Sequence, residues 1–183
     1  MKREQLDLAG RYNTRAFTIL EIATVLVIVL ILLTLLFPAI LSLQSRGDKA
    51  RCMANLRSLA VAVNLSVQDH GFWPQIDTHL LTTDKPKYAL RWIAELRPYG
   101  VTEVGWACPT VQRQMNDPDL NEPKNARIDY IPMPFDAKPR TAFKWSRHPW
   151  FVEASSAHGN GNLIIFTNGQ VEEALNLVPK PKS

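Results

Sequence analysis

Few residues of this chain have the types and the spacing that catalysis or metal binding requires. No serine lies in a G-x-S-x-G elbow, and no glycine-rich loop is placed to hold a phosphate. The histidines share no ligand spacing such as HExxH or HxxxH, and the pair His158-Gly159 is typical of a turn. We therefore predict no catalytic residues, no enzyme activity and no metal site. The four histidines are His70, His79, His148 and His158.

One polar segment, residues 116–122, is rich in oxygen atoms that a cation can use. Its sequence, NDPDLNE, offers the carboxylate and amide oxygens that Ca²⁺ prefers. The positions of these side chains do not follow the spacing of an EF-hand loop. We expect a solvated loop and no cofactor, with calcium binding as the alternative.

The most unusual ionisable residue is Glu21, because it stands at the start of a long apolar segment. In residues 22–41 only Thr24, Thr34 and Pro38 interrupt aliphatic and aromatic side chains. A helix of about 20 residues spans about 30 Å, the thickness of the hydrocarbon core of a bilayer. The segment is longer than the roughly 7–15 apolar residues of a secretory signal, and it lacks a small-x-small cleavage site. It predicts one membrane-spanning helix.

Charge excludes one class of partner and leaves the orientation of the helix open. The formal net charge is +4 over 183 residues, and no basic run with interleaved aromatic side chains is present. Nucleic acid is therefore not an expected partner. Lysines and arginines lie on both sides of the apolar segment, so the positive-inside rule does not orient it. The remaining residues, about 140, suffice for one globular domain.

The apolar segment is expected to continue as an amphipathic helix. Apolar side chains recur at intervals of three and four from Ala50 to Val67, with polar residues such as Arg57 between them. The helix should end near Gly71, because glycine favours the position after a helix. A short second helix is predicted at residues 89–96, and a loop at residues 112–127.

Short strands are predicted in the rest of the domain, at residues 104–108, 128–131 and 150–153. The clearest signal lies in residues 162–174, where Asn168-Gly169 separates two apolar runs. This pair predicts a hairpin with a two-residue type I′ turn, which needs positive φ at both positions. Most of the five tryptophans are expected to fill the core.

The residues around Glu21 resemble the processing site of type IV prepilins and type II secretion pseudopilins. The stretch AFTILE, residues 16–21, follows a basic, polar leader and precedes an aliphatic helix. That family typically shows Gly, then Phe-Thr-Leu-Ile-Glu, then a helix with a proline near its middle, where Pro38 lies here. Ala16 stands where glycine is usual, which predicts slower cleavage.

This resemblance implies a role for each matching residue. A membrane aspartyl peptidase is expected to cut between Ala16 and Phe17 on the cytoplasmic side and to methylate the new amino group of Phe17. Glu21, then the fifth residue of the mature chain, is expected to serve assembly. In a filament its carboxylate would enter an apolar bundle, where the Phe17 amine is the obvious counter-charge. Pro38 is expected where the helix bends or locally melts.

Three further stretches resemble a pseudopilin subgroup common in Planctomycetes and Verrucomicrobia. They are RCMANL (residues 51–56), WACP (106–109) and a closing hairpin in which AHG precedes NL and FTNGQV (157–171). In this hairpin Asn168 replaces the usual Asp. The resemblance places the domain in the periplasm, an oxidising compartment. We therefore predict a disulfide between Cys52 and Cys108, with two separate buried thiols as the alternative.

Together these features predict an α+β, pilin-like fold, in which one long N-terminal helix packs on a small antiparallel β-sheet. The expected parts are a prepilin leader (1–16), a transmembrane and assembly helix (17–41) and a periplasmic globular domain (42–183), whose helix continues to residue 70. The N-terminus is expected in the cytoplasm and the helix in the inner membrane.

The expected function is structural. The chain would be processed by a prepilin peptidase and methyltransferase and would polymerise with other pilin-like subunits into a pseudopilus for type II secretion. A minor pilin or a surface-exposed, adhesin-like binding protein is the alternative. A membrane-anchored envelope enzyme is a third class, which the missing catalytic residues disfavour.

Overall fold

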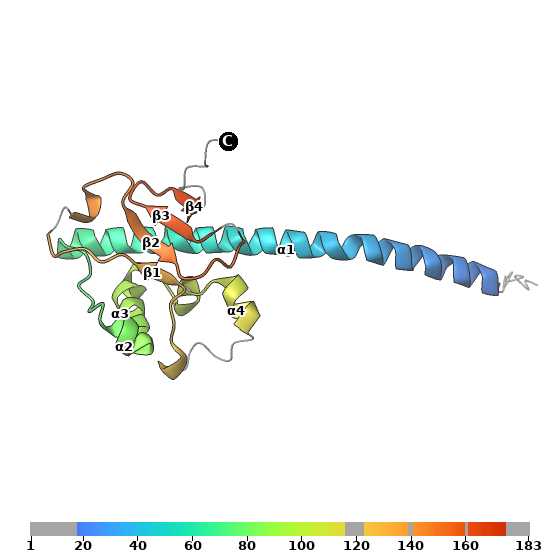
Figure 1. The fold of residues 1–183 in the computed structure, drawn as a ribbon, viewed down its shortest axis with the longest axis horizontal. Coiled ribbons are helices and arrows are strands. Elements are labelled where there is room, and N and C mark those ends of the chain that lie inside the picture. Colours follow the sequence, from blue (N-terminus) through green and yellow to red (C-terminus); the bar gives the residue numbers. More distant parts are fainter. Residues whose placement is uncertain (1–17, 116–122, 139–140, 160, 175–183) are drawn as a thin grey trace, which may run out of the picture. The chain divides into compact units, whose positions relative to one another are not determined.

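The computed structural model describes residues 18–115, 123–138, 141–159 and 161–174 (Figure 1). It has the predicted α+β layout, with a long N-terminal helix and a small antiparallel sheet. The chain divides into two units, residues 1–42 and 43–183, and the long helix α1 has residues in both. The helices are α1 (Ile19–His70), α2 (Leu80–Thr83), α3 (Lys85–Leu96) and α4 (Pro109–Met115), and the strands are β1 (Tyr130–Pro132), β2 (Pro149–Glu153), β3 (Leu163–Phe166) and β4 (Val171–Glu173).

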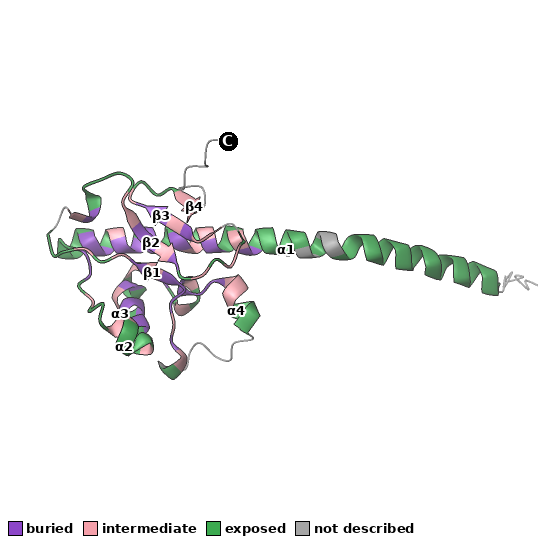
Figure 2. Cartoon of the chain, viewed as in Figure 1, coloured by how far each residue is buried: buried purple, intermediate pink, exposed green. Residues whose placement is uncertain are grey.

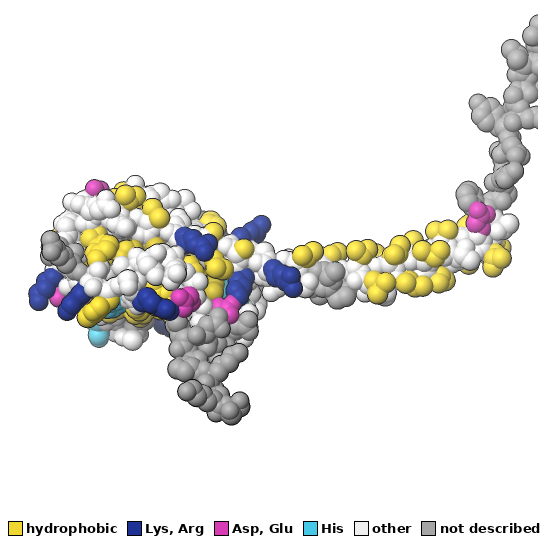
Figure 3. Space-filling view, turned by 90° about the horizontal axis from the view of Figure 1, so that it is seen from above, with side chains coloured by type: hydrophobic (Ala, Val, Ile, Leu, Met, Phe, Trp, Pro, Cys, Tyr) yellow, Lys and Arg dark blue, Asp and Glu magenta, His cyan; other side chains and the backbone are white. Residues whose placement is uncertain are grey.

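In the first unit, α1 exposes apolar side chains that no other described residue covers. The large aliphatic side chains from Ile19 to Leu36 are exposed, and hydrophobic atoms follow the helix in the space-filling view (Figures 2 and 3). A long apolar surface of this kind is unfavourable in water. By length and composition this helix could cross a membrane.

In the second unit, α1 becomes amphipathic and forms one wall of the core. Leu56, Leu59 and Val63 are fully buried, whereas Ala50, the start of the predicted stripe, is exposed. The helix ends at His70, as predicted. Gly71 follows it with φ +83°, and its N–H donates to the carbonyl of Val67 at 2.9 Å.

The sheet is an antiparallel meander in the order β1-β2-β3-β4. Tyr130 pairs with Glu153 across the first ladder, and Leu163 pairs with Glu173 across the last. The strands predicted at residues 128–131 and 150–153 are confirmed, with β1 shifted toward Pro132 at the edge of the sheet. Buried side chains of β1, β2 and β3 join those of α1 in one core.

Two predictions for the middle of the chain are wrong. Residues 104–108 are not a strand, because their backbone bonds are local: Gly105 N–H donates to Thr102 and Ala107 N–H to Val104 in a 3₁₀ turn at residues 103–106. Residues 112–127 are not all loop, since α4 extends to Met115. Pro109 begins α4, in keeping with the preference for proline in the first turn of a helix.

The second helix was predicted at residues 89–96 and is four residues longer at its start. The side chain of Asp84 accepts a hydrogen bond from the N–H of Lys87 at 3.0 Å, which caps α3. Pro86 stands in the first turn, where its missing N–H costs nothing. The cap therefore places the boundary ahead of the apolar stripe from which the helix was predicted.

The predicted hairpin is present, but its turn is one residue longer than predicted. Phe166 N–H donates to Gln170, and Gly169 N–H donates to Phe166, so the loop comprises Thr167, Asn168 and Gly169. This is the three-residue loop in which a residue with positive φ follows a β-turn. Gly169 supplies it with φ +77°. The two-residue type I′ turn is therefore wrong.

We expect Gly169→Ala to destabilise the domain by about 1–2 kcal/mol, because a side chain at this φ is strained. No atom lies within 4 Å of an added Cβ, so the cost comes from the backbone alone. Gly47→Ala is the matched control. It adds the same methyl group in open space inside α1, where it should stabilise the helix by up to about 1 kcal/mol. Urea midpoints of the two variants that shift in the same direction would contradict this expectation.

Candidate functional site

The chain carries two sets of residues that point to function, and the first is the beginning of α1. Thr18 Oγ1 accepts a hydrogen bond from the N–H of Glu21 at 3.2 Å. The pattern Thr-x-x-Glu is that of a capping box, and a carboxylate in the first turn also favours the helix dipole. Glu21 is the acidic side chain of this first turn, and its backbone N–H makes the bond to Thr18. Ala16 and Phe17, the predicted cleavage site, lie outside the described residues, and Pro38 lies within α1.

The second set lies in the core of the domain and begins with the two cysteines. Cys52 projects from α1, and Cys108 directly precedes α4. Their Sγ atoms are 2.9 Å apart, and both are free thiols shielded from solvent. The structure thus brings together the two residues of the predicted disulfide, and the bond itself stays a prediction.

Two more side chains complete what we call the cysteine–glutamate–histidine cluster: Cys52, Cys108, Glu153 and His158. Nε2 of His158 lies 3.6 Å from Sγ of Cys108 and 3.3 Å from Oε1 of Glu153. The His158 side chain is 2% exposed and that of Glu153 is 0% exposed. The potential ligand atoms of the four residues all lie within 4.8 Å of one another.

Neighbouring groups hold this cluster in place. The N–H of Cys108 donates to Oδ2 of Asp129 at 2.7 Å, and Asn55 Nδ2 donates to the carbonyl of Ala107 at 3.2 Å. Oε2 of Glu153 accepts from the N–H of Leu163 at 3.2 Å. Oε1 of Glu153 makes no hydrogen bond within the described part of the chain, although His158 lies close to it.

The electrostatics of the cluster are those of ionisable groups withdrawn from water. Burial raises the pKa of Glu153 to about 7, against the hydrogen bond from Leu163. The contact between the sulfurs lowers the pKa of Cys52 and raises that of Cys108. The Glu153 carboxyl thus favours its protonated form more than an exposed glutamate does.

This cluster is not predicted from the sequence, because the pair His158-Gly159 is typical of a turn. His158 does follow β2 in the connection to β3, but its ring turns inward to the sulfur of Cys108. The remaining histidines belong to no group of three or more metal-ligating side chains among the residues that the structure describes. The oxygen-rich segment 116–122 lies outside those residues.

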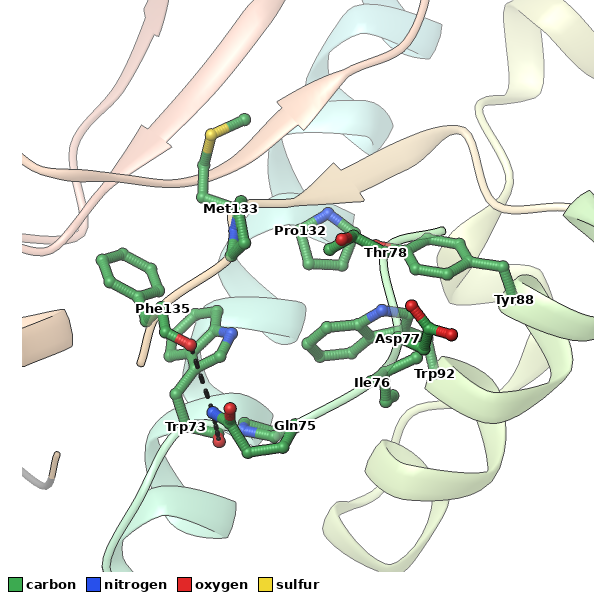
Figure 4. Close-up of a pocket in the computed structure, with 12 residues that line it drawn as sticks. Trp73, Gln75, Ile76, Asp77, Thr78, Tyr88, Trp92, Pro132, Met133 and Phe135 are labelled. Atoms are coloured by element: carbon green, nitrogen blue, oxygen red, sulfur yellow. Dashed lines mark hydrogen bonds between the residues drawn. The ribbon is translucent and has the colours of Figure 1, made fainter. Parts of the chain in front are cut away.

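A third feature is a cavity of about 370 Å³ beside the aromatic core (Figure 4). It lies between the segment after α1, helix α3 and the segment after β1. Gln75 closes one side, donating from Nε2 to the carbonyl of Phe135 at 3.2 Å. The indole N–H groups of Trp73 and Trp92, which line the cavity, are buried and have no hydrogen-bond partner in the described ranges.

Comparisons with known proteins bring no relative. A scan against protein-family models found no match, and searches of curated proteins and of solved structures found none either.

Proposed function

We propose that this chain is a pilin-like structural subunit, which is held in the inner membrane by the first part of α1 and polymerises through that helix into a type II secretion pseudopilus. The observation that carries this proposal is the exposed apolar surface of the first part of α1. This helix has a single carboxylate in its first turn and continues to His70 in the second unit. In the membrane, lipid covers this surface. In a filament, neighbouring copies of the helix would cover it.

The position of Glu21 supports assembly more than simple anchoring. An anchor needs an apolar helix of sufficient length, and a carboxylate in its first turn adds nothing to lipid burial. A filament needs its subunits in one axial register, and a buried charge with one available partner enforces such a register. The proposed partner is the α-amino group of Phe17 after cleavage, on the same or a neighbouring subunit.

The processing step gives the most direct test. When the chain is produced together with an active prepilin peptidase, we expect intact-mass spectrometry of the membrane protein to show the loss of residues 1–16. The new terminus should be Phe17, heavier by one methyl group. Ala16→Gly, which restores the usual residue of the family, should be cut at least as fast. Filament-incorporated protein that retains Met1 would contradict the proposal, and an inactive peptidase serves as the control.

The cavity beside Trp73 and Trp92 favours a second function, the minor pilin or adhesin-like binding protein. A cavity lined by aromatic rings suits a ligand with an apolar face. Immunogold labelling separates the two functions. Labels along the whole filament indicate a major structural subunit, and labels confined to its end indicate a tip protein.

A further inference from the structure

The cysteine–glutamate–histidine cluster contains the donor types of a closed zinc site. Zn²⁺ in proteins is bound by thiolate sulfur, imidazole nitrogen and carboxylate oxygen, most often by four ligands in a tetrahedron. Here each of those atoms comes from a side chain that is shielded from solvent. Ca²⁺ and Mg²⁺ require several oxygen ligands, and the cluster offers one carboxylate.

Two distances agree with a shared central ion, and all four ligand atoms lie within 4.8 Å of one another. Ligands at about 2.0–2.3 Å from a tetrahedral zinc ion lie about 3.3–3.8 Å from one another. His158 Nε2 lies 3.3 Å from the Glu153 oxygen and 3.6 Å from the Cys108 sulfur, inside this range. The two sulfurs, at 2.9 Å, would separate by somewhat less than 1 Å. Binding would therefore require the side chains to move by about 1 Å, so that the sulfurs separate and the widest separation, up to 4.8 Å, closes.

The surroundings resemble the outer shell of a metal centre. Such a shell fixes each ligand by hydrogen bonds to its other atoms. Leu163 N–H holds one oxygen of Glu153 and leaves the other facing His158, and Asp129 holds the backbone of Cys108. The buried Tyr130 hydroxyl lies against Cys52, where it can donate to a thiolate sulfur.

We propose that the cysteine–glutamate–histidine cluster binds one Zn²⁺ ion, which ties α1 to strand β2 and to the β2–β3 connection. Binding displaces one proton from each thiol, and also the proton of the Glu153 carboxyl where that group is protonated. The ion is then held by two thiolates, the carboxylate and the neutral imidazole. This inference goes beyond the proposed function and does not depend on it, because metal content is measured without any filament.

Two simpler arrangements each involve only two of the four side chains, whereas a zinc ion would involve all four. An ion pair between His158 and Glu153 would satisfy the carboxylate but gives the two adjacent thiols no part. A disulfide between Cys52 and Cys108 would give Glu153 and His158 no part. It also excludes the ion, because it consumes both sulfurs. A zinc ion would use all four side chains at once, including Oε1 of Glu153, which makes no hydrogen bond among the described residues.

The test is the metal content of the full chain in detergent micelles. For this measurement the protein is produced without a polyhistidine tag, which would itself bind metal. Its thiols are kept reduced by excluding air from cell lysis onward. We expect about one zinc per chain by inductively coupled plasma mass spectrometry. Glu153→Gln should weaken zinc binding by at least about tenfold, the lower limit found even for outer-shell partners. The exposed His79 lies outside the cluster, so His79→Gln should retain the full complement.

A second measurement guards against a variant that simply fails to fold. Co²⁺ added to the metal-free wild-type chain should produce a thiolate-to-cobalt charge-transfer band, and Zn²⁺ should remove it. A wild-type chain with two titratable thiols that gives no such band would overturn the proposal. A Cys52–Cys108 disulfide in the protein as isolated, or copper or iron in place of zinc, would overturn it as well.

Discussion

Glu21→Gln is expected to abolish incorporation into filaments while the chain is still cleaved and inserted in the membrane. In the proposed filament the Glu21 carboxylate pairs with the Phe17 amine inside an apolar bundle. Removing one partner of a buried pair costs about 3–5 kcal/mol, which lowers an association constant by more than about a hundredfold. Shearing of the cells followed by immunoblotting of the filament fraction measures the loss. Incorporation at the wild-type level would contradict the pairing.

The glutamine variant is chosen because it separates charge from helix capping. Glutamine can replace glutamate in a capping box, so the start of α1 keeps its local structure. Thr18→Ala is the complementary variant. It removes the hydroxyl that accepts from the N–H of Glu21, costs about 1 kcal/mol of helix stability and keeps the carboxylate. If capping were the function of Glu21, Thr18→Ala would fail in assembly and Glu21→Gln would not.

The parts of the fold that the sequence predicted well are those with local causes. The apolar length of α1, the glycine after it and the apolar runs around Asn168-Gly169 each act within a few residues. The errors arose where a neighbour decided the outcome. Residues 104–108 have a strand-like composition, but residues 103–106 form a 3₁₀ turn and Pro109 begins a helix soon after it.

The cluster in the core was harder to predict, because its ligands come from separate elements with no common spacing. One signal was nevertheless present in β2. Residues two apart in a strand point to the same face, so Glu153 shares the face of Phe151, and both are fully buried. A carboxylate on the inner face of a strand indicates a buried partner. Only the folded chain shows that the partners are His158 and the two cysteines.

The aromatic core gives the second large effect, and it is independent of any filament. Trp73 is 1% exposed and packs against Trp92, Phe135, Trp150 and Phe151, with ring centroids 4.7–6.4 Å apart. Its indole therefore joins α3, the sheet and the segment after β1. Buried rings of this size contribute through both the area removed from water and their contacts with each other.

We expect Trp73→Ala to lower the free energy of unfolding of the domain by about 3–5 kcal/mol, since it leaves a large cavity among rigid rings. A domain of this size has about 5–15 kcal/mol in total, so much of its stability would be lost. Trp145→Ala is the matched control, because Trp145 is 56% exposed, and we expect a change within about 0.5 kcal/mol.

Pulse proteolysis of the full chain in urea measures both midpoints. Trp73→Phe should fall between them, because it keeps an aromatic ring in the core and removes the unpaired indole N–H. Equal losses for Trp73→Ala and Trp145→Ala would show that the ring cluster does not hold the domain together.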